Sequence, residues 1–216
     1  MATARKWSNV AVAMQSALAA SIAVTAITKA AEGVVTTGTA HGFTGGEYIV
    51  LTAQGMRQVD DRVFRVKSGA SGSTFTLEGE DTTLFDTFTS GSLQKVTFGT
   101  SITTATSLSS SGGDFDFIDT TTIHQGARSQ VPGLPSAASF SFDNIWDISD
   151  AGLKAMKVAS DAQAKRAFMF TFGAGGQIML FNGYVGASLL PGGSAQQLVT
   201  TKTAITMNGT PTYYSA

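Results

Sequence analysis

The chain has 216 residues, no cysteine, 13% charged residues and a formal net charge of −1. The absence of cysteine excludes a disulfide framework and a thiolate zinc site, and near-neutrality argues against a generic nucleic-acid-binding protein, which carries a clear basic excess. Few charges together with 24 glycines and abundant Ser and Thr predict a turn-rich β protein, much of whose surface is covered by partners.

The first apolar stretch, Val10 to Val24, follows two basic residues and so has some features of a secretion signal. Gln15 and Ser16 interrupt it, and no run approaches the roughly 20 apolar residues that a transmembrane helix needs. Apolar residues instead alternate with small ones, which is typical of a strand. We therefore expect extended structure here and no association with a membrane.

A series of short strands follows, separated by turn-forming residues. The predicted strands are Gly33 to Thr37, Tyr48 to Ala53, Arg62 to Lys67, Thr74 to Leu77 and Leu93 to Phe98. After Phe98 the composition shifts toward Ser and Thr. We predict an inserted small β-barrel module over residues 27–98, within a core domain formed by residues 1–26 and 99–216.

The segment Thr100 to Ser111 is rich in Ser and Thr and is closed by Gly112-Gly113, which predicts a loop or flexible hairpin. Strands are expected at Phe115 to Ile123 and at Ser136 to Phe142. In the second of these, phenylalanines alternate with polar residues, as in a half-buried strand.

One helix is expected after these strands. Ser149 can cap its N-terminus, and Asp150 then lies in the first turn, where a negative charge suits the helix dipole. Its apolar stripe consists of Leu153, Met156, Ala159 and Ala162.

Beyond the helix, a strand projects Phe168, Phe170 and Phe172 to one face, and a glycine turn returns the chain as a hairpin. A last strand, Leu198 to Met207, is expected to end at Asn208-Gly209, leaving a tail over residues 211–216. The predicted fold class is therefore mainly β: a β-sandwich or barrel with one helix and an inserted small barrel.

No residue pattern predicts chemistry. His41 and His124 lie in separate segments without the partners of a triad or a zinc site. Asp114, Asp116 and Asp119 fail the EF-hand pattern, because Ile118 occupies the third ligand position and no bidentate Glu follows. We expect no catalytic residues, no metal and no cofactor, and hence no enzyme.

The order of motifs in the second half carries a resemblance. It contains Phe140-Ser141-Phe142-Asp143, Trp146 to Leu153 with the sequence WDISDAGL, Phe181-Asn182-Gly183-Tyr184-Val185, and Gly209-Thr210-Pro211-Thr212. This ordered set resembles the tail tube proteins of long-tailed bacteriophages. The segments Ala40 to Phe43 and Gly46 to Val50 also resemble a small β-barrel module that recurs in phage structural proteins.

The resemblance implies a self-assembling virion protein. Tail tube subunits form stacked rings, typically hexameric, that make a conduit through which genomic DNA passes without specific binding. It also implies other tail proteins as partners (tape measure, terminator and tail tip), a place in the phage tail, and assembly in the host cytoplasm. The alternatives are a tail terminator, a capsid decoration protein and, in another class, a carbohydrate-binding β-sandwich.

Two sets of residues are candidates for tube function. Asp114, Asp116 and Asp119 give the predicted core strands a local acidic excess that would repel DNA, so we expect some of them to line the lumen. Trp7, Tyr213 and Tyr214 lie near the chain ends and are of types favoured at interfaces, so we expect terminal arms that contact neighbouring subunits.

Overall fold

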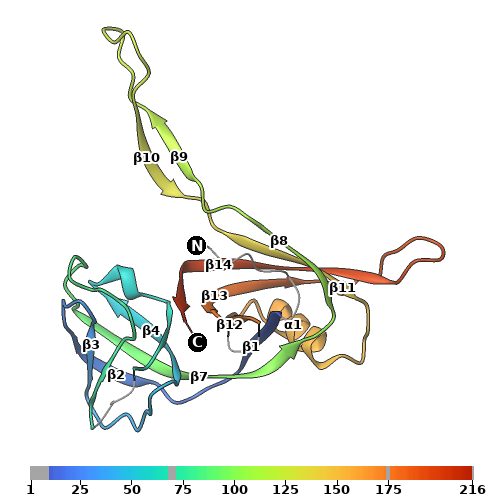
Figure 1. The fold of residues 1–216 in the computed structure, drawn as a ribbon, viewed down its shortest axis with the longest axis horizontal. Helices are drawn as coiled ribbons and strands as arrows, with labels where there is room; N and C mark the ends of the chain where they lie inside the picture. The colour runs from blue at the N-terminus through green and yellow to red at the C-terminus, as the bar shows by residue number, and fades with distance from the viewer. Residues whose placement is uncertain (1–9, 68–71, 174–175, 216) are drawn as a thin grey trace.

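The computed structural model describes residues 10–67, 72–173 and 176–215 (Figure 1). This part of the chain is mainly β with one α-helix, which confirms the predicted fold class. The elements are β1 (Val10–Leu18), β2 (Ile22–Ile27), β3 (Val34–Thr37), β4 (Tyr48–Gln54), the 3₁₀ helix η1 (Arg57–Val59), β5 (Val63–Arg65), β6 (Thr74–Thr76), β7 (Ser90–Ile102), β8 (Ala105–Ser111), β9 (Phe115–Asp119), β10 (Gln130–Pro135), β11 (Ser139–Ile145), α1 (Ala151–Asp161), β12 (Lys165–Phe172), β13 (Ile178–Ala187) and β14 (Thr200–Tyr214).

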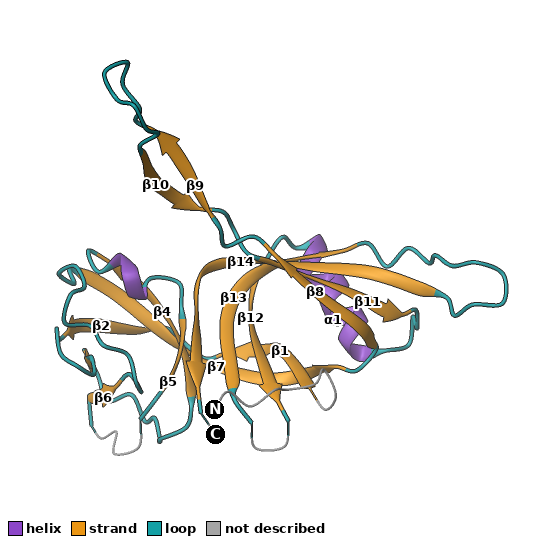
Figure 2. Cartoon of the chain, turned by 45° about the horizontal axis from the view of Figure 1, so that its top comes forward, coloured by secondary structure: helices purple, strands orange, loops and turns teal. Residues whose placement is uncertain are grey.

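Within the described residues, twelve strands form one antiparallel sheet in the order β6-β3-β2-β7-β1-β12-β13-β14-β11-β8, to which β4 and β5 are joined through β7. Strands β9 and β10 form a separate two-stranded sheet. The large sheet curves, and α1 packs inside the curve against β13 and β7 (Figure 2). The expectation of extended structure near the chain start is confirmed by β1 and β2. No helix in the described ranges is long and apolar enough to span a membrane.

Two hydrophobic clusters lie at opposite ends of this sheet. The first packs α1 against β1 and β11 to β14, and it includes the fully buried Phe168 and Phe181, whose rings stack at 5.4 Å. The second is formed by β2 to β7, and it already includes Val24, which lies before the predicted module boundary. Strand β7 runs through both, because Leu93 packs in the second cluster and Ile102 in the first. The division into a 27–98 module and a core stays a prediction.

Two expectations about irregular segments are wrong. The Ser/Thr-rich segment expected as a loop or flexible hairpin is the end of β7 and the whole of β8. These two strands do not pair with each other, and the residues of β8 lie opposite those of β11 in the sheet. The last strand does not end at Asn208-Gly209 but continues to Tyr214. A β-bulge lies there, and Gly209, with φ of +74°, takes the left-handed conformation that the bend requires.

Helix α1 begins one residue later than its sequence suggests. Asp150, not Ser149, is the N-cap, and its carboxylate accepts a hydrogen bond of 2.7 Å from the backbone N–H of Leu153. Ser149 instead donates its own hydroxyl and N–H to Asp147. Three members of the predicted stripe, Leu153, Met156 and Ala159, are buried. The prediction is wrong for the fourth, Ala162: the helix ends at Asp161, and Ala162 is its exposed C-cap.

This geometry predicts unequal effects of two alanine substitutions at the helix start. Asp150→Ala should lower the free energy of unfolding by about 1 kcal/mol, because an N–H of the first turn loses its acceptor. Ser149→Ala should change it by less than about 0.5 kcal/mol. Chemical denaturation of both variants measures the difference, and equal losses would contradict the assignment of the cap.

Candidate assembly surfaces

A two-stranded hairpin, residues 114–135, projects away from the body of the molecule (Figures 1 and 2). It continues the ribbon formed by β8 and β11, and it leaves that ribbon at Gly112-Gly113, where φ is +82° and +89°. A Cβ at Gly112 would lie 2.3 Å from the carbonyl oxygen of Ala137. The two segments of the ribbon can therefore approach this closely only because residue 112 is glycine.

The hairpin exposes apolar side chains on both of its faces. Phe117 is 62% exposed, Ile118 61% and Leu134 87%. None of these residues belongs to a buried cluster, so the hairpin carries apolar surface that the described part of the subunit does not cover. Exposed apolar surface of this kind marks interaction sites.

The candidate lumen residues Asp114, Asp116 and Asp119 all lie on this hairpin and are exposed. The expectation that they belong to the strands of the core is wrong, because β9 pairs only with β10 among the described strands. Asp119 accepts hydrogen bonds from the Thr121 side chain and backbone N–H, and these lower the pKa of its carboxyl. Whether any of the three faces a lumen stays a prediction.

Strand β8 forms one edge of the large sheet. It pairs with β11 on one side, and in the described part of the chain no strand pairs with its other side. Its seven residues, ATSLSSS, include no charge and no proline, although these are the residues by which natural edge strands resist pairing with other chains. Beside this edge lies an open apolar hollow that Val10, Val12, Leu108 and Phe142 help to line.

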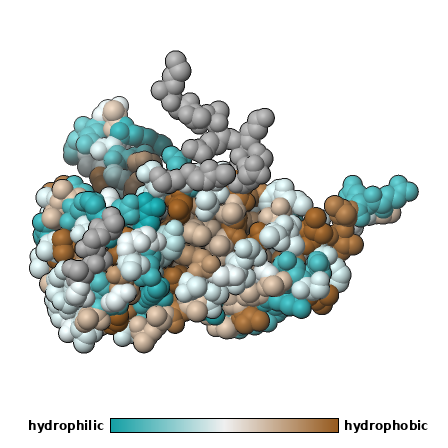
Figure 3. All heavy atoms as spheres, turned by 60° about the horizontal axis from the view of Figure 1, so that its bottom comes forward, coloured by the Kyte–Doolittle hydropathy of each residue, from teal (hydrophilic) through white to brown (hydrophobic). Residues whose placement is uncertain are grey.

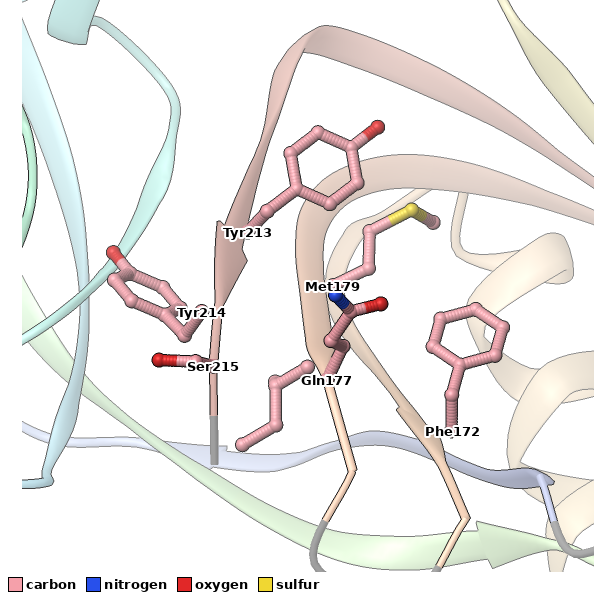
Figure 4. Close-up of a pocket in the computed structure, with 7 residues that line it drawn as sticks. Phe172, Gln177, Met179, Tyr213, Tyr214 and Ser215 are labelled. Carbon is pink, nitrogen blue, oxygen red and sulfur yellow. The ribbon is translucent and has the colours of Figure 1, made fainter. Parts of the chain in front are cut away.

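A second hollow, of about 340 Å³, lies where β12 and β14 end and β13 begins (Figure 4). It is lined by Phe172, Gln177, Ile178, Met179, Tyr213, Tyr214 and Ser215. The two tyrosines project to opposite sides of β14, so that Tyr213 is 69% exposed and Tyr214 is 6% exposed. The Tyr214 hydroxyl accepts a hydrogen bond from the backbone N–H of Arg65, and burial raises the pKa of this hydroxyl.

Comparison with known families gives a match over most of the chain. The sequence pattern of the family described as "Phage tail tube protein, TTP" matches residues 54–216. This chain belongs to the phage tail tube protein family. Comparison with curated proteins gives no match.

Membership places this tail tube protein among structural components of the phage tail, where self-assembly and contact with other tail components are general properties. The family is structural, and no site in the described residues suggests chemistry. No group of three or more His, Asp or Glu side chains among these residues is placed to hold a metal ion. His41 is buried, and its ring nitrogens bond to Thr74 and Phe43 within the fold.

The expected terminal arms of this tail tube protein are only partly described. Trp7 lies outside the described residues. The expectation of a separate C-terminal arm is wrong for Pro211 to Tyr214, which form the end of β14. The buried Tyr214 joins two parts of its own subunit, whereas a contact of the exposed Tyr213 with a neighbour stays a prediction.

Sequence reasoning missed both candidate assembly surfaces of this tail tube protein. The edge character of β8 depends on the order of strands in the sheet, which its sequence does not state. The hairpin did leave a signal in the sequence. Strand β9 has apolar residues on both of its faces, as a buried strand would, yet its partner β10 contains two prolines. Prolines favour an edge or isolated ribbon over the centre of a sheet.

The surface between these features is weakly polar. Figure 3 shows apolar and intermediate residues mixed across the middle of one face, with strongly hydrophilic residues gathered at one end and at the tip of the loop between β13 and β14. This distribution agrees with the low content of charged residues. A surface so poor in charge fits a protein that is covered by other subunits.

Proposed function

We propose that this tail tube protein polymerises as stacked, hexameric rings that form a conduit for delivery of the phage genome. The family supports the role in the tail, and the assembly surfaces support the mode of polymerisation. Contacts between unlike surfaces of identical subunits close into rings when the rotation allows it and extend openly along an axis when it does not.

One observation carries the proposal: a single chain has both an unprotected sheet edge and a projecting apolar hairpin. The β8 edge offers backbone groups that no described strand pairs with, along one side of the large sheet. The hairpin offers Phe117, Ile118 and Leu134 well away from that sheet. In a monomer both surfaces would promote uncontrolled aggregation, whereas in an ordered assembly both are covered.

The proposed partners follow from this role. Other copies of the chain make the ring and ring-to-ring contacts, and the tape measure, terminator and tail-tip proteins contact the assembled tube. Genomic DNA passes through without specific binding, for which a chain with net charge of −1 is suitable. Assembly takes place in the host cytoplasm, and the product is part of the virion.

Negative-stain electron microscopy of the purified protein tests the proposal. Rings or tubes of uniform diameter are expected. A compact monomer at every concentration tested would contradict self-assembly, and the order of symmetry in ring images decides whether the rings are hexameric.

Charge on the β8 edge should disrupt this assembly. Ser109 and Ser110 are exposed, and Ser109→Lys/Ser110→Lys would place two like charges on the edge. We expect at least about a tenfold loss of assembled protein at equal concentration, or about 1.4 kcal/mol in the association equilibrium. Analytical ultracentrifugation measures the loss. Ser194→Lys, on the exposed loop between β13 and β14, is the control and should assemble normally. Unchanged assembly of the double variant would remove β8 from the subunit interface.

A further inference from the structure

The region formed by β2 to β7 is joined to the rest of the subunit along the end of β14. Between them lies a small hydrophobic cluster of Val63, Val96, Ala167, Leu180 and Tyr214. Around it, β5 and the residue before it are connected to β14 by hydrogen bonds that involve side chains: Thr212 Oγ1 donates to Val63 O at 2.6 Å, and Arg62 Nε donates to Thr210 O at 3.2 Å. The bond from Arg65 N–H to the Tyr214 hydroxyl, 2.9 Å long, is the third of this kind.

Beside this cluster, β14 bends at its bulge. The pairing of β13 with β14 shifts between Leu180↔Thr212 and Asn182↔Asn208, so one strand has extra residues at this point. Gly209 supplies the bend, and its Cα lies close enough to Arg62 that an added Cβ would be 3.7 Å from Arg62 Cγ. A bulge commonly re-aims a neighbouring side chain. Here the side chain is that of Asn208, which points at Asp61.

Asp61 receives donors from three adjacent strands of the large sheet. Its carboxylate accepts from Asn182 Nδ2 on β13 at 2.8 Å, and also from Asn208 Nδ2 on β14 and Lys165 Nζ on β12. The Asp61 side chain is 18% exposed and that of Lys165 37% exposed, so the ion pair is partly withdrawn from water. In such a partly buried position, several donors stabilise the ionised form of a carboxylate. Loss of that charge leaves these donors without a charged acceptor.

The backbone at Asp61 is also fixed. Its φ of +59° lies in the left-handed region, which Asp tolerates better than most residues, and its N–H donates to Leu51 O at 2.8 Å. The turn therefore holds the carboxylate toward β12, β13 and β14, whereas the carboxylate itself makes no described bond within the turn.

We propose that Asp61 is a positioning residue that clamps the β2–β7 region to strands β12, β13 and β14 at a fixed orientation. The other half of this clamp consists of the three residues that donate to Asp61, namely Lys165, Asn182 and Asn208. The hydrophobic cluster supplies contact area without directional preference, whereas the three-donor carboxylate, beside the hydrogen bonds to the end of β14, favours one angle between the two parts. This inference concerns a single subunit and does not depend on polymerisation.

Distance measurements between spin labels test the clamp in the full chain. The protein contains no cysteine, so labels can be attached to cysteines introduced at Leu84, which is 93% exposed, and at Lys154, which is exposed on α1. Asp61→Asn is close in shape but loses the charge and places an amide N–H₂ against other donors. We expect its distance distribution to broaden to at least about twice the width in the unaltered chain, as for a released hinge.

Asp161→Asn is the matched control, because Asp161 also pairs with a lysine, Lys157, but on the exposed surface of α1. It should leave the distance distribution unchanged.

Asn208→Asp is the second variant: it places a carboxylate against Asp61 without changing the shape of the side chain, and it should broaden the distance distribution as well. Asp61→Glu, which keeps the charge, should restore part of the narrow distribution.

Thermal unfolding separates this role from a purely stabilising one. If Asp61→Asn or Asn208→Asp lowers the melting temperature but keeps the distribution as narrow as that of Asp161→Asn, Asp61 does not set the orientation and the proposal is overturned. If Asp61→Asn does not fold, Asn208→Asp alone decides by the same criterion.

Discussion

Removal of the β9–β10 hairpin is expected to abolish tube formation while leaving a folded subunit. Residues 114–135 would be replaced by an Asn-Gly turn that joins Gly113 to Ser136. These two residues are already adjacent, since the N–H of Gly113 donates to the carbonyl of Ser136 at 3.1 Å, and Asn-Gly suits a two-residue hairpin turn. Electron microscopy of the shortened protein is the measurement.

The subunit should tolerate this deletion because no hairpin residue belongs to a buried cluster. Its melting temperature should therefore stay within a few degrees of the full chain, corresponding to about 1 kcal/mol or less. A shortened protein that is folded by circular dichroism and still forms tubes of normal length would exclude the hairpin from the contacts between subunits.

Point substitutions refine the same prediction without removing backbone. Phe117→Ser with Leu134→Ser takes away two apolar side chains, each worth about 1.5–3 kcal/mol when fully buried. The yield of tubes should fall at least tenfold, at about 1.4 kcal/mol per factor of ten. Leu84→Ser is the control, because Leu84 is also an exposed apolar residue but lies in the β2–β7 region. An equal loss with Leu84→Ser would indicate a general effect of surface polarity.

The sequence predicted those elements whose pattern is set by burial within the subunit. The alternating phenylalanines of β12 and the stripe of α1 each have one buried face, and such a face leaves a regular period in the sequence. The fold class and the family followed from these segments. Elements whose partners lie far away in the sequence left no such period.

Strand β8 illustrates the limit. Its serines are weak strand formers, and they are extended because β11 pairs with them across a ladder that joins Ser139 to Ser111. The C-terminal part of β14 is similar: Asn208-Gly209 is typical of a turn, and the strand continues beyond it because Thr212, Tyr213 and Tyr214 pair with the start of β13. The clamp around Asp61 joins four segments that lie up to 147 residues apart, so no local spacing could predict it.

The last prediction concerns the acidic residues of the hairpin, and it rests on the proposed role as a DNA conduit. Replacement of Asp114, Asp116 and Asp119 by Lys is expected to slow DNA ejection and lower infectivity by at least about tenfold. Each lysine that touches phosphate adds affinity through counterion release, and a conduit that binds its cargo retards it. The pKa of the Asp119 carboxyl is lowered by its bonds to Thr121, so this carboxyl is ionised at neutral pH in the unaltered protein.

Two further variants locate the effect. Asp116 and Asp119 are three residues apart on β9, and alternate residues of a strand face opposite sides, so these two carboxylates point to different faces of the hairpin. If one face lines the lumen, either Asp116→Lys or Asp119→Lys should reproduce most of the delay, and the other should not.

Salt and charge controls separate electrostatics from damage to the tube. Replacement of the same three residues by Asn removes the carboxylates without adding phosphate contacts, so it should delay ejection much less. Ejection in vitro through the lysine variant should recover as salt rises, because screening shortens from about 10 Å at 0.1 M to about 3 Å at 1 M. Tubes must first be shown to form normally. Normal ejection through such tubes at low salt would show that these positions do not face the DNA or that their charge does not matter.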